Sequence, residues 1–167
     1  MKHFTEPTDE IYEFVVGPDR LVAVVLGNPA VKKRAGRTPN GRVYNPSQRL
    51  EKEFAKVIME QLKGVGHPNF TFGNMSSLEV YVTLNFAVCG RTTAERQRSL
   101  WAKGDPDNFC KFIQDSLQGY LFANDKQIVK LHCHKIGWVG IPQSYTRVEI
   151  VRQKDNETVK LWNASTG

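Results

Sequence analysis

The chain has 167 residues, of which 40% are hydrophobic, and it carries a formal net charge of +6. This length suits a single domain with a buried core, and the composition excludes a fully disordered chain. The sequence contains no apolar run of 18 residues and no hydrophobic segment after its first residues, which argues against a membrane span and a secretory signal. We therefore expect a cytoplasmic protein with one domain over residues 1–167, made of a core at about 12–151 and a polar tail at 152–167.

The three cysteines, Cys89, Cys110 and Cys133, are odd in number and lack paired C-x-x-C spacing. That pattern is typical of neither a disulfide framework nor a zinc site. We expect reduced, buried thiols.

The first predicted elements are a hairpin and a helix. Residues 13–16 and the strongly apolar residues 20–26 are expected to be strands, with a turn at 17–19 between them. A helix is expected to start at Asn45-Pro46, with the asparagine as cap, and to end at Gly64. Its apolar face is expected to pack into the core and consists of Leu50, Phe54, Val57, Ile58 and Leu62.

Positive charge gathers in two stretches. Residues 32–42 contain no acidic residue, and residues 91–103 contain Glu95 alone. Such clusters indicate a polyanion partner, although a merely solvated basic surface would have the same composition. The second stretch lacks apolar periodicity and is expected to be either disordered before substrate binds or one short helix. The candidate nucleic-acid-binding residues are Lys32, Lys33, Arg34, Arg37, Arg42, Arg96, Arg98 and Lys103.

Residues 104–111, with the sequence GDPDNFCK, carry the most distinctive chemistry. Proline is favoured in the first turn of a helix, so we expect a helix that starts at Asp105 or Pro106 and ends near residues 118–119. Asp107 and Lys111 then lie on one polar face, four residues apart. The opposite face is expected to enter the core and consists of Phe109, Phe112, Ile113, Leu117 and Tyr120.

Asp125 follows after the chain turns back. If it folds beside the start of the helix, it joins Asp105 and Asp107, and two carboxylates 4 Å apart repel by about 4 kcal/mol at an effective dielectric constant of 20. A divalent cation would relieve this repulsion, and oxygen-only ligands suit Mg²⁺, with Mn²⁺ as an alternative. The simpler alternative is that Asp105 and Asp107 only cap the helix and that Asp125 is an ordinary turn residue.

Three further strands are expected, at residues 78–88, 127–137 and 145–151. The residues expected to point inward from the second of them are Val129, Leu131 and Cys133. Two helices on one face of a small mixed sheet make a two-layer α+β domain, which is the predicted fold.

His132 and His134 are expected on the outer side of the same strand. Their spacing would suit a zinc site, but no third nitrogen or sulfur ligand lies nearby in the sequence. We therefore expect both histidines to face solvent or DNA.

The acidic motif and the tetrad after it resemble the RusA family of Holliday junction resolvases. The shared pattern is Asp-x-Asp-Asn, a lysine four residues after the second aspartate, and (Asn/Asp)-Asp-x-Gln before a strand. The resemblance covers about residues 20–151 and includes Gly27-Asn28-Pro29 and Tyr44-Asn45-Pro46. Here the motif positions are Asp105, Asp107, Asn108, Lys111, Asp125 and Gln127. This chain has Asn124 where the family often has a further acidic residue, which leaves the role of position 124 open.

The resemblance implies a Mg²⁺-dependent endonuclease that nicks two strands of a four-way DNA junction and acts as a homodimer. It implies that Asp105, Asp107 and Asp125 are catalytic metal ligands. Lys111 would contact the scissile phosphate, and its alternative role is a salt bridge to Asp107. Two other classes stay open: a nuclease-inactive DNA-binding protein of the same fold, and a small basic partner-binding protein whose acidic residues are only caps.

Overall fold

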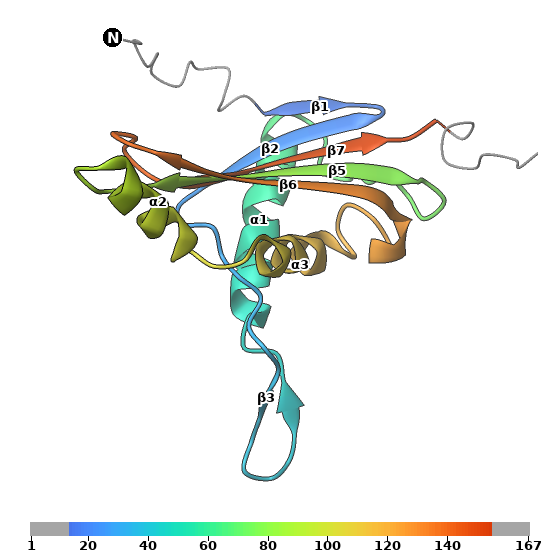
Figure 1. Ribbon diagram of the computed structural model, residues 1–167. Helices are drawn as coiled ribbons and strands as arrows, with labels where there is room; N and C mark the ends of the chain where they lie inside the picture. The colour runs from blue at the N-terminus through green and yellow to red at the C-terminus, as the bar shows by residue number, and fades with distance from the viewer. Residues whose placement is uncertain (1–13, 155–167) are drawn as a thin grey trace, which may run out of the picture.

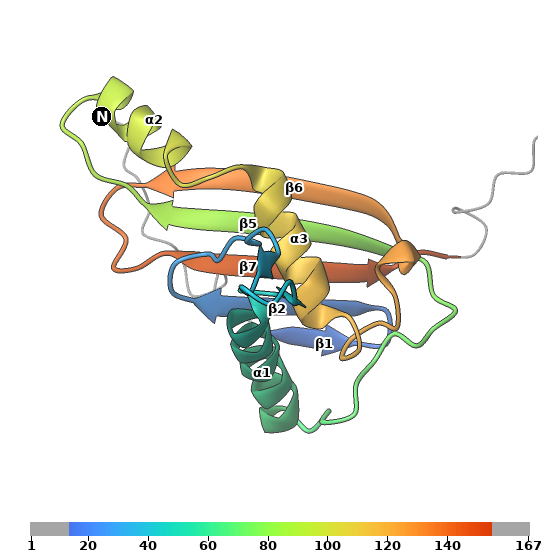
Figure 2. The same ribbon diagram turned by 90° about the horizontal axis from the view of Figure 1, so that it is seen from below.

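The computed structural model describes residues 14–154 and contains a five-stranded sheet with helices packed on one face (Figures 1 and 2). The expectations for residue 13 and for the tail beyond residue 154 lie outside the described residues. The strands of this sheet are β1 (Val15–Gly17), β2 (Arg20–Leu26), β5 (Leu78–Ala87), β6 (Ile128–Trp138) and β7 (Tyr145–Arg152). The helices are α1 (Gln48–Gly64), α2 (Thr93–Trp101) and α3 (Pro106–Leu117). The predicted α+β fold is confirmed. Among residues 14–154 no helix combines the length and the apolarity that crossing a membrane requires.

The sheet is mixed, with the strand order β1-β2-β7-β5-β6. β1 and β2 form the predicted antiparallel hairpin, and β7 pairs antiparallel with both β2 and β5. β5 and β6 are parallel, so their connection must cross over the sheet, and α2 and α3 lie in that crossover. Figure 2 shows α3 running across the strands, next to α1.

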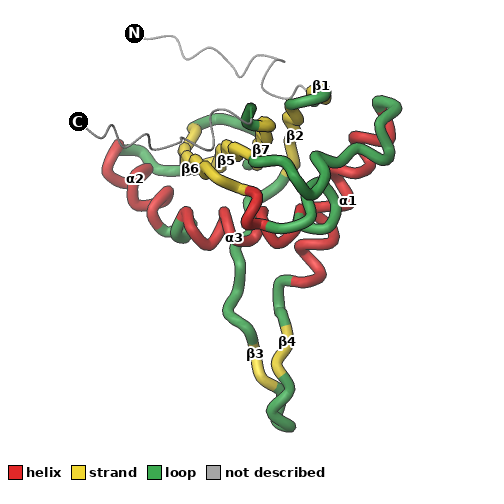
Figure 3. Tube along the Cα trace, turned by 90° about the vertical axis from the view of Figure 1, so that its right-hand side faces the viewer, coloured by secondary structure: helices red, strands yellow, loops and turns green. Residues whose placement is uncertain are grey.

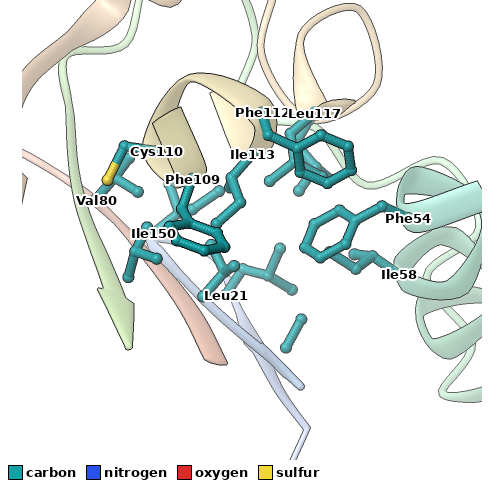
Figure 4. Close-up of a cluster of buried hydrophobic side chains, with 14 of the residues drawn as sticks. Leu21, Phe54, Ile58, Val80, Phe109, Cys110, Phe112, Ile113, Leu117 and Ile150 are labelled. Carbon is teal, nitrogen blue, oxygen red and sulfur yellow. The ribbon is translucent and has the colours of Figure 1, made fainter. Parts of the chain in front are cut away.

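The core lies between the sheet and the helices α1 and α3 (Figure 4). Phe54 of α1 meets Phe112 of α3 edge to face, with ring centroids 5.6 Å apart. Phe109 meets Phe86 of β5 at the same centroid distance. Such pairs contribute about 0.5–1.5 kcal/mol beyond the area they bury. This packing fixes which face of α3 is left polar. The alternating apolar residues of β5 are buried in this core, namely Leu78, Val80, Val82, Leu84 and Phe86.

The start of α1 differs from the prediction. The helix begins at Gln48 and its N-cap residue is Ser47, not Asn45. The Asn45 side chain is used elsewhere, because its Nδ2 donates to Glu51 Oε2 at 2.9 Å while its Oδ1 accepts from the backbone of Ser47 at 3.0 Å. The predicted apolar face of the helix is also incompletely buried, since Leu50 and Val57 are 41% and 37% exposed.

β6 is an edge strand, and some inward predictions near it are wrong. Val129 falls at a register shift in the pairing with β5 and is 42% exposed. Leu131 lies opposite the buried Val80, on the predicted side of the sheet, but it is 41% exposed because β6 is at the edge of the described sheet. Tyr120 lies beyond the end of α3 and is 45% exposed.

Cys133 packs against the core as predicted. All three cysteines are free, but only Cys110 is buried as predicted, whereas Cys133 is half-buried and Cys89 is exposed.

The first basic stretch folds into a hairpin that projects away from the rest of the protein (Figures 1 and 3). Its strands β3 (Gly36–Arg37) and β4 (Val43–Tyr44) pair antiparallel. A side chain at Gly36 would collide with Tyr44, because an added Cβ would lie 2.4 Å from the Tyr44 ring. We call residues 33–44 the arm.

The second basic stretch forms one short helix, α2, which is one of the two predicted alternatives. Thr92 caps it: its Oγ1 accepts from the Glu95 backbone at 3.2 Å, and the Glu95 carboxylate accepts from the Thr92 backbone at 3.1 Å. This reciprocal capping box satisfies two donors that the helix leaves unpaired.

Candidate active site

The N-terminus of α3 presents two carboxylates. Asp105 is the N-cap residue and Pro106 lies in the first turn, as predicted. The Asp105 side chain makes no capping hydrogen bond to its helix, and both Asp105 and Asp107 are exposed. Capping alone therefore does not explain why an aspartate stands at position 105.

The edge strand β6 holds this helix start in place. Lys135 Nζ donates to the carbonyl of Gly104 at 2.7 Å, and Cys133 Sγ donates to the carbonyl of Pro106 at 3.8 Å. Gly104 has a φ of 109°, a conformation that favours glycine at the turn into the helix. Two side chains of β6 thus hold the backbone on either side of Asp105 in place.

Asp125 is held by a short 3₁₀ turn, η2 (Asp125–Gln127), just before β6. Asn124 caps this turn, because its Oδ1 accepts from the backbone of Lys126 at 2.9 Å. Gln127 Nε2 donates to two carbonyls of the loop before β5, at 2.8 and 3.1 Å. Asn124 therefore has a structural role in shaping the turn that carries Asp125.

Lys111 joins α3 to Asp125. Its Nζ lies 3.3 Å from Asp125 Oδ2 and 3.0 Å from Asp115 Oδ1. The hydrogen bond to Asp115 raises the pKa of Lys111, so its positive charge persists well above neutral pH. The expected alternative, a salt bridge to Asp107, does not form in the described structure, where the ion pairs of Lys111 are with Asp115 and Asp125.

The three predicted metal ligands lie on or beside α3 but are not drawn together. Within residues 14–154, no three His, Cys, Asp or Glu side chains are grouped closely enough to hold a metal ion. Their chemistry nevertheless fits Mg²⁺, since Asp105 and Asp107 are exposed carboxylates two residues apart on one helix end. The structure thus brings Asp125 to Lys111, one helical turn beyond Asp107, without forming a three-carboxylate group.

The predicted DNA-binding residues differ in their exposure and in whether other side chains or carbonyls already bind them. Lys32 Nζ is 2.5 Å from Glu51 and 2.8 Å from Asp115, and its side chain is 22% exposed. Arg96 is half-buried and donates to the carbonyl of Gly90 at 3.0 Å. The remaining six are exposed on the arm or at α2, namely Lys33, Arg34, Arg37, Arg42, Arg98 and Lys103.

Sequence reasoning missed two acidic residues that organise this region, Asp115 and Glu51. Asp115 follows Lys111 by four residues, a spacing that signals an ion pair on a helix. Burial alone would raise the pKa of Asp115, but hydrogen bonds from Lys32 and Lys111 outweigh burial and lower it. Glu51 is 8% exposed. Its position on the expected apolar face of α1 could have indicated from the sequence that this carboxylate is buried.

The two histidines of β6 do not form a metal site in the described structure. His132 Nε2 lies 2.9 Å from Glu79 Oε1, and its ring stacks on Tyr81 with centroids 4.5 Å apart. His134 is exposed.

A comparison with models of known protein families matched residues 23–151 to the family described as endodeoxyribonuclease RusA. The chain belongs to the RusA family. The match spans the arm, α3 and η2, so the elements that carry the candidate site all lie within it. RusA membership implies a Holliday junction resolving endonuclease that binds branched DNA. A search of curated proteins found no match to the chain.

Proposed function

We propose that this RusA-family protein is a Mg²⁺-dependent, structure-selective endonuclease that resolves four-way DNA junctions by paired nicks. The observation that most supports this function is the position of Lys111. This lysine lies on α3, the helix that presents Asp105 and Asp107 at its start, and it forms an ion pair with Asp125 of η2. Hydrolysis of a phosphodiester needs an activated water, charge neutralisation at phosphorus and in-line geometry. Carboxylates that bind a cation, beside a protonated lysine, are suited to the first two tasks.

The residues that would hold Mg²⁺, or Mn²⁺ in its place, are Asp105, Asp107 and Asp125. When bound, the ion would activate water and polarise the phosphate. Asp105 and Asp107 offer their oxygens at a helix N-terminus, where the helix dipole favours negative charge by about 0.3–1 kcal/mol. Asp125 offers its oxygens from η2, whose shape is fixed by Asn124 and Gln127.

Lys111 is proposed to contact the scissile phosphate. Its side chain is 50% exposed and therefore within reach of a bound strand. A lysine is protonated at neutral pH, and the hydrogen bond to Asp115 raises the pKa of Lys111 further, so its positive charge can stabilise the negative charge that develops in the transition state.

The exposed basic residues of the arm and of α2 are proposed to contact the DNA backbone. Such contacts orient the protein on its substrate without reading the base sequence. This agrees with a nuclease that recognises the shape of a junction. The residues concerned are Lys33, Arg34, Arg37, Arg42, Arg98 and Lys103, with Arg96 and Lys32 as supporting residues.

We also propose that the protein acts as a homodimer. A four-way junction with two-fold symmetry presents two equivalent strands, and a two-fold dimer presents two equivalent sites. Paired nicks then follow from one active site per subunit.

The deciding experiment incubates labelled four-way junction, flap and linear duplex with the wild-type protein and with Asp107→Asn. We expect paired nicks in the junction from the wild type with Mg²⁺, and none after chelation of the metal. Asp107→Asn should bind the junction as tightly as the wild type and cut nothing, because it removes one carboxylate ligand. Saturating Mn²⁺ should raise the melting temperature of the wild type by several degrees, but not that of the variant.

Asp19→Asn is the matched control, since Asp19 is an exposed aspartate 3.5 Å from Arg152 and remote from α3 in the sequence. This variant should cut like the wild type. Cleavage by Asp107→Asn at the wild-type rate would remove Asp107 from the catalytic set. A wild type that binds junctions but never cuts them would favour the nuclease-inactive alternative.

A further inference from the structure

Both ends of the arm are bound by one buried carboxylate. Lys32 precedes the arm and Asn45 follows it, and these two residues contact different oxygens of the Glu51 carboxylate on α1. Lys32 Nζ is 2.5 Å from Glu51 Oε1, and Asn45 Nδ2 is 2.9 Å from Glu51 Oε2. Glu51 is 8% exposed, so water competes little for these contacts.

The base of the arm is also attached directly to α3. The backbone of Lys32 donates to the carbonyl of Asn108 at 3.0 Å, and its Nζ is 2.8 Å from Asp115 Oδ2. The backbone of Lys33 donates to Ser47 Oγ at 2.9 Å, which ties the arm to the start of α1 as well. The arm therefore leaves the protein from a point fixed between two helices (Figure 3).

Asp115 continues this connection to the candidate active site. Its Oδ2 binds Lys32 and its Oδ1 binds Lys111 at 3.0 Å, and Lys111 in turn binds Asp125 at 3.3 Å. The charges alternate in sign along the whole series, so each group neutralises its neighbours. We call this series the charge chain, and its members are Glu51, Lys32, Asp115, Lys111 and Asp125.

Asp115 occupies the middle of the charge chain and is well placed to orient Lys111. A lysine side chain is long and flexible, so a single exposed partner leaves its ammonium group mobile. Asp115 is 21% exposed whereas Lys111 is 50% exposed, so the carboxylate is the fixed partner and the ammonium reaches outward from it. Lys32 offsets the negative charge that would otherwise accumulate at Asp115.

We propose that Asp115 is a positioning residue that directs Lys111 toward the scissile phosphate, and that Lys32 and Glu51 extend this control to the arm. The arm and the catalytic lysine are then oriented by one set of ion pairs, so a junction gripped by the arm meets a lysine already in place. The inference rests on the proposed nuclease function and adds a residue that does not itself touch the substrate.

The first test measures single-turnover cleavage and junction affinity for Asp115→Asn and Asp115→Glu. We expect Asp115→Asn to lower the cleavage rate by about 10–100-fold, as for other residues that orient a catalytic group, with the dissociation constant within about twofold of the wild-type value. Asp115→Glu should recover most of the rate because it restores the charge. Glu60→Gln is the matched control, since Glu60 also forms an ion pair with a lysine four residues away on an exposed helix face.

The second test needs no nuclease activity. Lys32→Met should raise the rate of tryptic cleavage after Arg34 by at least about fivefold, because release of the arm base increases local opening. Lys52→Met on α1 is the control and should leave that rate unchanged, since Lys52 is exposed.

Each result bears on a separate part of the proposal. Wild-type cleavage rates in Asp115→Asn, or a decrease explained wholly by weaker binding, would overturn the positioning role while leaving the nuclease function intact. If the wild type cut no junction, that role would fall together with the proposed function. An unchanged tryptic rate in Lys32→Met would overturn the link to the arm in either case.

Discussion

Glu79 is a buried carboxylate on the sheet face that points away from the helices. It is 8% exposed and accepts hydrogen bonds from the Tyr81 hydroxyl at 2.6 Å, from His132 at 2.9 Å, and from Gln153. The Tyr81 hydrogen bond is the main cause that lowers the pKa of Glu79, with smaller contributions from His132 and Lys130. The charged form of Glu79 is therefore the form that the fold stabilises.

We predict that Glu79→Gln lowers the free energy of unfolding by about 1–3 kcal/mol at neutral pH, the usual cost of disturbing a buried charged hydrogen-bond partner. Because the pKa of Glu79 is lower in the folded state, its contribution is present above the unfolded value of about 4.3 and is lost as the pH falls through the folded value. The difference in unfolding free energy between the wild type and the variant should thus become smaller as the pH falls.

Urea denaturation at a series of pH values measures this difference. Glu53→Gln is the control, because the Glu53 side chain is 55% exposed and pairs only with Arg49 in the described structure. A difference that stayed constant down to about pH 3 would contradict the assignment to Glu79 ionisation.

Lys111 illustrates how far a single residue can be predicted. Its presence on a polar helix face followed from spacing alone, but spacing offers two partners, Asp107 before it and Asp115 after it. The choice of Asp115 depends on Lys32 and Asp125, which come from distant parts of the chain. No local pattern contains that information.

At the scale of elements, the arm is the least predictable part of the structure. The sequence predicted a basic stretch over residues 32–42 and no strands within it. Its strands are only two residues each, too short for an alternating pattern, and they depend on the Tyr44 ring lying against Gly36. By contrast α3 was predicted within a residue at its start, because Pro106 and the apolar spacing are both local signals.

We predict that the double variant Arg37→Ala/Arg42→Ala weakens junction binding and flattens its dependence on salt. Removing one basic side chain from a phosphate reduces the slope of log K against log salt by about 0.9, so removing two should reduce it by close to 2. Folding should be unaffected because both side chains are exposed.

Fluorescence anisotropy across a salt series measures the slope. The double variant Lys52→Ala/Lys56→Ala on α1 removes the same charge from another surface and serves as the control. Equal slopes for the two double variants would mean that the arm is only a general source of positive charge.

At the scale of the whole molecule, the strand order shows what periodicity cannot supply. Each of the five main strands was expected close to its actual position, and the α+β class followed from them. The strand order β1-β2-β7-β5-β6 could not be predicted from the sequence pattern. The last strand, β7, inserts between β2 and β5, which both come much earlier in the chain. Strand pairing is decided by the packing of the complete chain.

We predict that mixed dimers of wild type and Asp107→Asn make a single nick per junction. If each subunit contributes one site, a dimer with one inactive site can cut only one of the two equivalent strands. Differently tagged subunits allow the mixed species to be purified, and denaturing gels of doubly labelled junctions count the nicks.

Tagged wild-type dimers are the control and should cut both strands. Paired nicks from the mixed species, or sedimentation of the active protein as a monomer, would refute one site per subunit.

The central place of β7 has a consequence for biosynthesis. Until residues 145–152 have left the ribosome, β2 and β5 have no shared neighbour and each exposes an unpaired edge. The sheet against which α3 packs is then incomplete. The pairing of β7 with β2 and β5 joins residues far apart in the sequence, and such contacts form slowly. We therefore expect a nascent chain to be unable to cut DNA even after Asp105, Asp107 and Asp125 have been translated, so that activity begins only when the sheet closes.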